Sequence, residues 1–291
     1  MFDLVAIMRT LFFKIGLPDM QLKKTFSALV VNRSGGVGKT LLTQALRILM
    51  ASPAGEDWRP ISVDSVEGGQ HSKLSRLMPE CVDIPIAPAL SVIEEGSFPF
   101  YQLWDEVYLN IARGSAMVDF GANVVPAFSQ WLEILETDRN GIDYPPSFLI
   151  VPITSSGQAL RDGVATIEGF WKTQQVLPIS RTIVFFNEVF GPVENPISPD
   201  YEWLLRRARE GKLTILRMPK CEGPLLAAFD AQDIPVFAVL RMNDDQLSAM
   251  FGLTDLRRRT LAQKQLLEFL IAIGNELIKA GLMDFKAKAQ P

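Results

Sequence analysis

The most constraining feature of this 291-residue sequence is a glycine-rich segment, residues 32–40, which reads Asn-Arg-Ser-Gly-Gly-Val-Gly-Lys-Thr. It follows a β-rich apolar run at 27–32 and leads into 39–50, where apolar residues recur at helical spacing. Because glycine tolerates positive φ and has no Cβ, backbone N–H groups of such a loop can close around phosphate oxygens at the start of a helix. The segment therefore predicts a strand–loop–helix unit that binds the phosphates of a nucleotide.

Two side chains at the end of this segment carry the expected chemistry. Lys39 supplies a cation that reaches the β and γ phosphates, and Thr40 supplies a hydroxyl for Mg²⁺. A chance glycine-rich turn before a helix is the alternative, which the strand–loop–helix context disfavours. The residues expected to bind the nucleotide here are Arg33, Ser34, Gly35, Gly36, Val37, Gly38, Lys39, Thr40 and Leu41.

Strands and helices alternate along the rest of the chain. Further strands are expected at 60–64, 115–119, 147–153, 181–187 and 213–218. Helices are expected at 101–113, 124–137, 156–175, 199–210, near 223–231, near 243–250 and at 255–281, with an irregular segment at 79–100. Because the strands are continuous apolar runs, they predict an α/β fold: a mostly parallel β-sheet with helices on both faces, in three layers.

Composition excludes several classes of protein. The chain is 48% hydrophobic and 21% charged, which is globular composition, and its formal charge of −4 argues against a bulk polyanion binder. Cys81 and Cys221 lack the spacing of a zinc site, and His71 is the only histidine. The cysteines argue against a disulfide framework and a zinc site, and the single histidine excludes chemistry that needs two.

The N-terminal residues 1–19 are expected to form an amphipathic helical appendage to a single domain at 20–291. Residues 1–17 show a broad apolar face interrupted by charges, which favours packing on the main domain or a partner subunit. A membrane-surface helix and a natural start at Met20 are the alternatives. With no run of 18 uncharged apolar residues and no cleavage signal, we expect a cytoplasmic protein.

The loop departs from the common phosphate-binding pattern GxxxxGK[ST], because Arg33 occupies the place of its first glycine. It resembles instead the deviant phosphate loop of the ParA/MinD family of dimerising ATPases, xKGGxGK[ST]. The resemblance extends over about residues 27–280. It implies a P-loop NTPase fold, ATP and Mg²⁺ as cofactors, and a homodimer that forms with nucleotide between its subunits.

One position breaks the resemblance. The signature lysine of the family, which reaches across the dimer to the partner's nucleotide, would fall at Ser34. Serine is short and neutral, whereas the adjacent Arg33 could reach a phosphate from a different backbone position. We expect slow or altered hydrolysis, and leave open conventional hydrolysis and binding without turnover.

The resemblance also assigns roles to two carboxylates. Asp64 ends the second strand, where the family places an acid that orients the attacking water, although only Glu67 could substitute for the second acid of that segment. Asp119 ends the third strand like a Walker B aspartate, and would hold Mg²⁺ through a water. A turn or helix-cap role is the alternative for Asp64 and for Asp119.

Two further strand ends are expected to contact the base. In the family, an asparagine at the place of Asn187 reads the adenine edge, and the segment around Pro219 packs along the base. The absence of the pattern NKxD favours ATP over GTP. Both residues could instead be ordinary strand-end residues. Gln70 and His71 could belong to a nucleotide-sensing loop, although an ordinary surface role is the simpler reading for His71.

A partner surface is suggested by the arginines Arg257, Arg258 and Arg259 at the start of the last long helix. DNA-binding members of the family contact DNA phosphates nonspecifically with basic residues in this part of the domain. The alternative is a solvated helix face paired with nearby acids such as Asp255 and Glu268. A protein partner that stimulates hydrolysis is also expected.

The function that the sequence favours is a nucleotide-dependent dimeric ATPase that positions or segregates a plasmid, other DNA or another cargo, or supports conjugation. The missing signature lysine favours a divergent branch such as the plasmid stability and mobilisation ATPases; that step rests on family analogy. The alternatives are a metabolic ATP-dependent ligase of the same superfamily and a non-hydrolysing nucleotide-binding scaffold at the membrane.

Overall fold

The computed structural model describes the chain in nine stretches: residues 20–21, 26–50, 58–65, 71–86, 98–135, 146–222, 234–252, 255–282 and 284–285. The helices expected at 1–17 and near 223–231 lie outside these stretches, as do Glu67 and Gln70.

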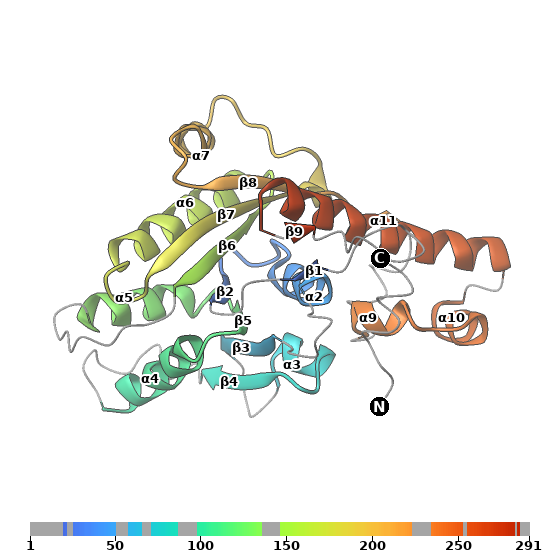
Figure 1. The fold of residues 1–291 in the computed structure, drawn as a ribbon, viewed down its shortest axis with the longest axis horizontal. Helices are drawn as coiled ribbons and strands as arrows, with labels where there is room; N and C mark the ends of the chain where they lie inside the picture. Colours follow the sequence, from blue (N-terminus) through green and yellow to red (C-terminus); the bar gives the residue numbers. More distant parts are fainter. Residues whose placement is uncertain are drawn as a thin grey trace, which may run out of the picture.

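Seven parallel strands form the central sheet, in the order β4-β3-β5-β2-β6-β7-β8 (Figure 1). Their bounds are β2 Ser27–Val30, β3 Arg59–Ser65, β4 Val82–Ile86, β5 Ala116–Phe120, β6 Ser147–Ile153, β7 Ile179–Asn187 and β8 Thr214–Met218. The predicted parallel sheet is confirmed, and so is the three-layer α/β fold.

Strand β4 corrects the expectation of an irregular segment at 79–100. It pairs only with β3, at the edge of the sheet. An edge strand tolerates proline and acidic residues, which is why Asp83 and Pro85 hid its strand character in the sequence.

The helices cover both faces of the sheet (Figure 1). Their bounds are α2 Lys39–Leu49, α3 Lys73–Leu77, α4 Phe98–Ala112, α5 Val125–Leu135, α6 Gly157–Lys172, α7 Pro199–Arg209, α9 Val236–Val239, α10 Asp244–Phe251 and α11 Leu256–Lys279, with a 3₁₀ turn at Glu188–Phe190. The short α3 and α9 were not expected from the sequence. Among the described residues, none of the helices combines the length and apolar character needed to cross a membrane.

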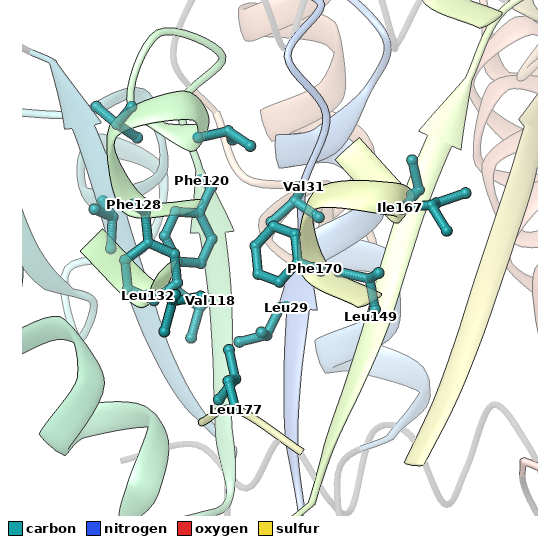
Figure 2. Close-up of a cluster of buried hydrophobic side chains, with 14 of the residues drawn as sticks. Leu29, Val31, Val118, Phe120, Phe128, Leu132, Leu149, Ile167, Phe170 and Leu177 are labelled. Atoms are coloured by element: carbon teal, nitrogen blue, oxygen red, sulfur yellow. The ribbon is translucent and has the colours of Figure 1, made fainter. Parts of the chain in front are cut away.

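Two hydrophobic cores lie on opposite faces of the sheet. Successive side chains of β2 alternate between them: Leu29 and Val31 enter one core, and Ala28 and Val30 the other. The first core lies against α4, α5, α6 and α7, and Figure 2 shows its rings and aliphatic side chains around Leu29 and Val31. The second lies against α2, α9, α10 and α11. Burial on both faces explains why the strands read as continuous apolar runs.

A separate two-stranded antiparallel sheet joins β1, Met20–Gln21, to β9, Asp284–Phe285. It pairs Met20 with Phe285, so the two ends of the described chain meet. The sequence pattern gave no sign of this pairing, because two-residue strands carry no periodicity.

Candidate nucleotide-binding site

The glycine-rich loop leaves the carboxyl end of the central strand β2 and enters α2 at Lys39. Gly36 and Gly38 have positive φ, +69° and +90°, which residues with a Cβ rarely adopt. No side chain caps the start of α2. The first N–H groups of this helix therefore face the loop without a side-chain acceptor, which is the arrangement that binds an anion.

Lys39 folds back over this loop. Its Nζ donates to the carbonyl oxygen of Asn32 at 3.1 Å and to that of Ser34 at 2.8 Å. Burial lowers the pKa of Lys39, while the nearby carboxylates of Asp119 and Asp64 act in the opposite direction. The ammonium thus lies inside the loop, held by carbonyl oxygens with which phosphate oxygens would compete.

Thr40 and Asp119, the two predicted metal residues, are brought together. Thr40 Oγ1 donates to Asp119 Oδ2 at 2.7 Å, and Asp119 is 6% exposed. The other oxygen of that carboxylate, Oδ1, is buried with no hydrogen-bond partner. Burial raises the pKa of Asp119 to about 6. A hydroxyl beside a carboxylate oxygen without a partner fits Mg²⁺, which prefers oxygen ligands and takes the rest from water and phosphate.

Asp64 lies at the same edge of the sheet. Its Oδ1 accepts from the backbone N–H of Ser65 at 2.8 Å, and burial raises the pKa of its carboxyl. The charge of Lys39 lowers the pKa of Asp64, and the charge of Asp64 in turn raises the pKa of Lys39 and of Asp119. The role of Asp64 in orienting water stays a prediction.

Gly121 is a site residue that the sequence reading missed. A Cβ at this position would lie 1.8 Å from Asp64 Oδ1, so the carboxylate of Asp64 occupies the space that a side chain would fill. The signal was a glycine two residues after the strand-end Asp119. The structure explains this glycine: the absence of a side chain at position 121 leaves room for the carboxylate of Asp64.

Ser34, at the place of the signature lysine of the ParA/MinD loop that this segment resembles, is bonded within the chain. Its Oγ donates to Asp162 Oδ2 on α6 at 2.5 Å, and its backbone N–H donates to Asn32 Oδ1 at 2.8 Å. Gln158 Nε2 donates to the other oxygen of Asp162. This serine therefore joins the loop to α6.

Arg33, which the sequence predicts to bind the nucleotide, lies against α6 in this structure. A Cβ at Gly169 would lie 3.5 Å from Arg33 Nη2 and 3.6 Å from Ser129 Oγ, which places the guanidinium against α6 beside α5. The backbone N–H of Arg33 points to Thr166 Oγ1, also on α6, at 3.4 Å. The side chain turns toward α6, where Gly169 leaves room for it, and its contact with a phosphate stays a prediction.

Asn187 supports the loop in this structure, and its expected contact with adenine stays a prediction. Its Nδ2 donates to the carbonyl of Val37 at 2.9 Å, and its Oδ1 accepts from the N–H of Val189 at 3.1 Å. A Cβ at Gly38 would lie 2.7 Å from the same Nδ2. Both ends of the buried amide are engaged within the protein, so Asn187 braces the loop from the end of β7.

The remaining predicted residues take ordinary positions. Pro219 is half-buried just after Met218, whose methyl group would lie 3.2 Å from a Cβ at Gly38, so this strand end is beside the loop. Leu41 packs against the second core. His71 is exposed, with Nδ1 3.3 Å from Asp83 Oδ2. Packing of Pro219 along a base stays a prediction.

Among known proteins, no family model matches the sequence and no curated protein matches it. Solved structures do match. A Cyanothece McdA–ATP complex aligns at 12% identity and TM-score 0.44, covering 92% of this chain and all of its own. A plasmid partition protein of Borrelia burgdorferi B31 bound to AMPPNP aligns at 12% identity and TM-score 0.36, covering 86% of this chain and 99% of its own.

The cell division protein FtsY of Thermotoga maritima aligns at 14% identity and TM-score 0.34, covering 73% of this chain and 67% of its own. At these values the likeness identifies neither an activity nor a partner. The topology and the loop of this chain themselves define its architecture: a seven-stranded parallel α/β sandwich of the P-loop NTPase type, with its phosphate loop after the central strand.

Proposed function

We propose that this chain binds ATP and Mg²⁺ at the carboxyl edge of its sheet. The observation that carries the proposal is the pairing of Thr40 with Asp119 at 2.7 Å, next to a glycine-rich helix start, with one buried oxygen of Asp119 left without a partner. An unpartnered buried oxygen is costly unless a ligand satisfies it. A hydrated magnesium ion beside bound phosphates satisfies it.

The residues of the loop and of the neighbouring strand ends have separate roles in this proposal. The N–H groups at the start of α2 hold phosphate oxygens, and Lys39 exchanges its two carbonyl partners for them. Thr40 and Asp119 hold the metal, which when bound neutralises charge on the phosphates. Asp64, whose pKa is raised by burial, orients a water near the terminal phosphate and accepts its proton.

The biological role proposed is that of a nucleotide-dependent dimeric switch that positions or segregates a plasmid, other DNA or another cargo. The resemblance of the loop to the ParA/MinD family supports it. Hydrolysis is proposed to be slow, because Ser34 is bonded to Asp162 of its own subunit and carries no charge to a partner's nucleotide.

Light scattering on size exclusion, with and without ATP and Mg²⁺, tests the switch. Wild type is expected to dimerise only with ATP and Mg²⁺, and Lys39→Ala is expected to stay monomeric. Lys264→Ala is the matched control, because it removes an exposed lysine of α11 that pairs with Glu268. A monomer under all conditions, in a protein shown to bind ATP, would exclude the dimeric switch.

A nucleotide-binding module without turnover is the second candidate, favoured by the same bond between Ser34 and Asp162. Phosphate release under single-turnover conditions separates the two. Slow release that Asp64→Asn abolishes supports the ATPase. Tight binding of ATP with no release above the rate in buffer supports the passive module.

A further inference from the structure

The phosphate loop holds one charged side chain among three positions: two that are basic in this chain, and one where the ParA/MinD family has its signature lysine. Lys39 lies in the loop, Arg33 is turned against α6, and Ser34 is neutral. A bound triphosphate carries more negative charge than a single ammonium balances, even beside a divalent metal. A second cation at the edge of the sheet beyond the loop would balance the remaining charge.

The short helix α3 brings one there. Asp83 of β4 fixes the start of this helix: its Oδ2 accepts from the N–H of Ser72 at 3.1 Å and from Ser75 Oγ at 2.9 Å. Lys73 is the first residue of α3, directly after Ser72. The helix packs against β3, next to β4, as Figure 1 shows.

Strand register then relates this helix start to the metal residue. Asp83 pairs with Ser62 of β3, and Ser62 pairs with Asp119 of β5, so the three side chains form a row on one face of the sheet. Thr40, which bonds Asp119, shows that this is the face covered by α2. Lys73 therefore stands over the same face as the loop, on the far side of Asp119 from it.

The charge of Lys73 acts on Asp119, one of the two predicted metal ligands. Its ammonium lowers the pKa of Asp119, in the same direction as Lys39. Lys73 is half-buried. The charges of two ammonium groups therefore act on Asp119, one from the loop after β2 and one from α3 beside β3.

The strand order indicates which phosphate the second ammonium would meet. From the loop outward, the order is β2, β5 with Asp119, β3 with Asp64, and β4. Phosphates that begin at the loop and pass the metal residue extend toward β3. The group nearest to Asp64 and α3 is then the terminal phosphate.

We propose that Lys73 is a second cation of this site, which binds the γ-phosphate of ATP opposite Lys39. The inference rests on the proposed function, since it needs a nucleotide in the loop. It makes Lys73 a residue that distinguishes ATP from ADP. It also supplies from within the subunit a positive charge that Ser34 cannot supply.

Calorimetric titration of ATP and of ADP, each with Mg²⁺, into nucleotide-free protein tests this assignment. In Lys73→Met the affinity for ATP is expected to fall about tenfold while that for ADP changes less than about twofold, because only ATP has the terminal phosphate. Lys73→Arg is expected to recover most of the loss. Arg76→Met, which removes an exposed cation from the same helix, is the matched control and is expected to leave both affinities unchanged.

The outcomes separate a failure of the role of Lys73 from a failure of the proposed nucleotide site. Equal losses for ATP and ADP, no loss for either, or an ATP-selective loss in Arg76→Met would each overturn the role of Lys73 while leaving the nucleotide site in place. Failure of the wild type to bind either nucleotide would overturn the proposed function and this inference together. Thermal melting of each variant checks that loss of affinity is not loss of the fold.

Discussion

At the residue scale, Asp119 has the least favourable surroundings in the described site. Burial raises its pKa from 3.8 to about 6, despite the hydrogen bond from Thr40 and the charge of Lys39. An acid whose pKa is higher in the folded state keeps its proton longer there than in the unfolded chain. The unfolded state therefore loses that proton first, and stability falls as the pH rises from about 4 to about 6.

Asp119→Asn removes this ionisation. Without nucleotide, the variant is expected to be more stable than the wild type at pH 7.5, by an amount on the order of 3 kcal/mol at most, and by only about a third of that amount at pH 4.5. With ATP and Mg²⁺ the order reverses, because the wild type gains ligand stabilisation that the variant lacks. Melting temperatures across this pH range measure both effects. A variant less stable than ligand-free wild type at pH 7.5 contradicts the electrostatic account.

The contact of Gly121 with Asp64 gives a second prediction at this scale. Gly121→Ala forces the carboxylate of Asp64 to move, since the new Cβ would lie 1.8 Å from its Oδ1, and is expected to lower stability by about 1–3 kcal/mol. In an Asp64→Ala background most of that loss disappears, because the clashing carboxylate is gone. Denaturant unfolding of the four proteins of this cycle measures the coupling. Additive effects would mean that the two residues do not share this space.

At the scale of elements, the phosphate loop depends on a strand and a helix that are distant from it in sequence. Strand β7 supplies Asn187, which bonds the carbonyl of Val37, and α6 supplies Asp162, which accepts from Ser34. Gly38, with φ of +90°, fits beneath the amide of Asn187. These bonds from β7 and α6 order the loop before a nucleotide binds. Less conformational entropy is then lost on binding.

Asn187→Ala removes one of these two supports. We expect it to weaken ATP and ADP alike, and to lower stability by about 1–3 kcal/mol, because the carbonyl of Val37 loses its buried donor. Asn110→Ala is the matched control: it removes a buried amide on α4 that bonds Glu106, far from the loop in sequence. It should cost stability without changing nucleotide affinity. A loss confined to ATP in Asn187→Ala would instead point to a direct contact with the nucleotide.

Sequence periodicity predicted the long elements well and the short ones poorly. The six strands expected from apolar runs all form, with β6 at its predicted bounds, because a strand buried on both faces must be apolar throughout. β4 and α3 escaped notice because an edge strand with Asp83 and Pro85, and a helix of five residues, carry too short a pattern. These missed elements are the ones that place Lys73.

At the scale of the whole molecule, strand order decides which residues meet. The loop lies after β2, between β5 and β6, so Asp119 of β5 reaches Thr40 across one strand spacing. This meeting could be expected from the motif and the parallel sheet. The orientations of Arg33 and Asn187 could not, because they depend on the room at Gly169 of α6 and on the turn after β7.

The arginines at the start of α11 belong to this scale, because DNA binding depends on the charge that an assembly presents. Arg257 and Arg258 are exposed, whereas Arg259 lies 3.5 Å from Asp244 and is half-buried. Two exposed arginines per subunit give four in a dimer. On a chain with a formal charge of −4, so few contacts favour weak, nonspecific binding that requires the dimer.

We therefore expect DNA binding only with ATP and Mg²⁺, with a slope of about −4 in a plot of log affinity against log salt concentration. Arg257→Gln with Arg258→Gln should abolish it. Arg206→Gln with Arg209→Gln, which removes the same charge from α7, should leave it nearly intact. Fluorescence anisotropy with a labelled duplex measures both. Equal losses in the two pairs would show that net charge, not this patch, governs binding.

The central claim, that the loop after β2 binds the phosphates of ATP with Mg²⁺, is tested most directly by calorimetric titration of ATP into the wild type and into Lys39→Ala, with Mg²⁺ and with chelator. The account predicts one site per subunit in the wild type, weaker binding in chelator, and a loss of more than about tenfold in Lys39→Ala. Equal affinity in the two proteins, or no binding by a folded wild type, would contradict it.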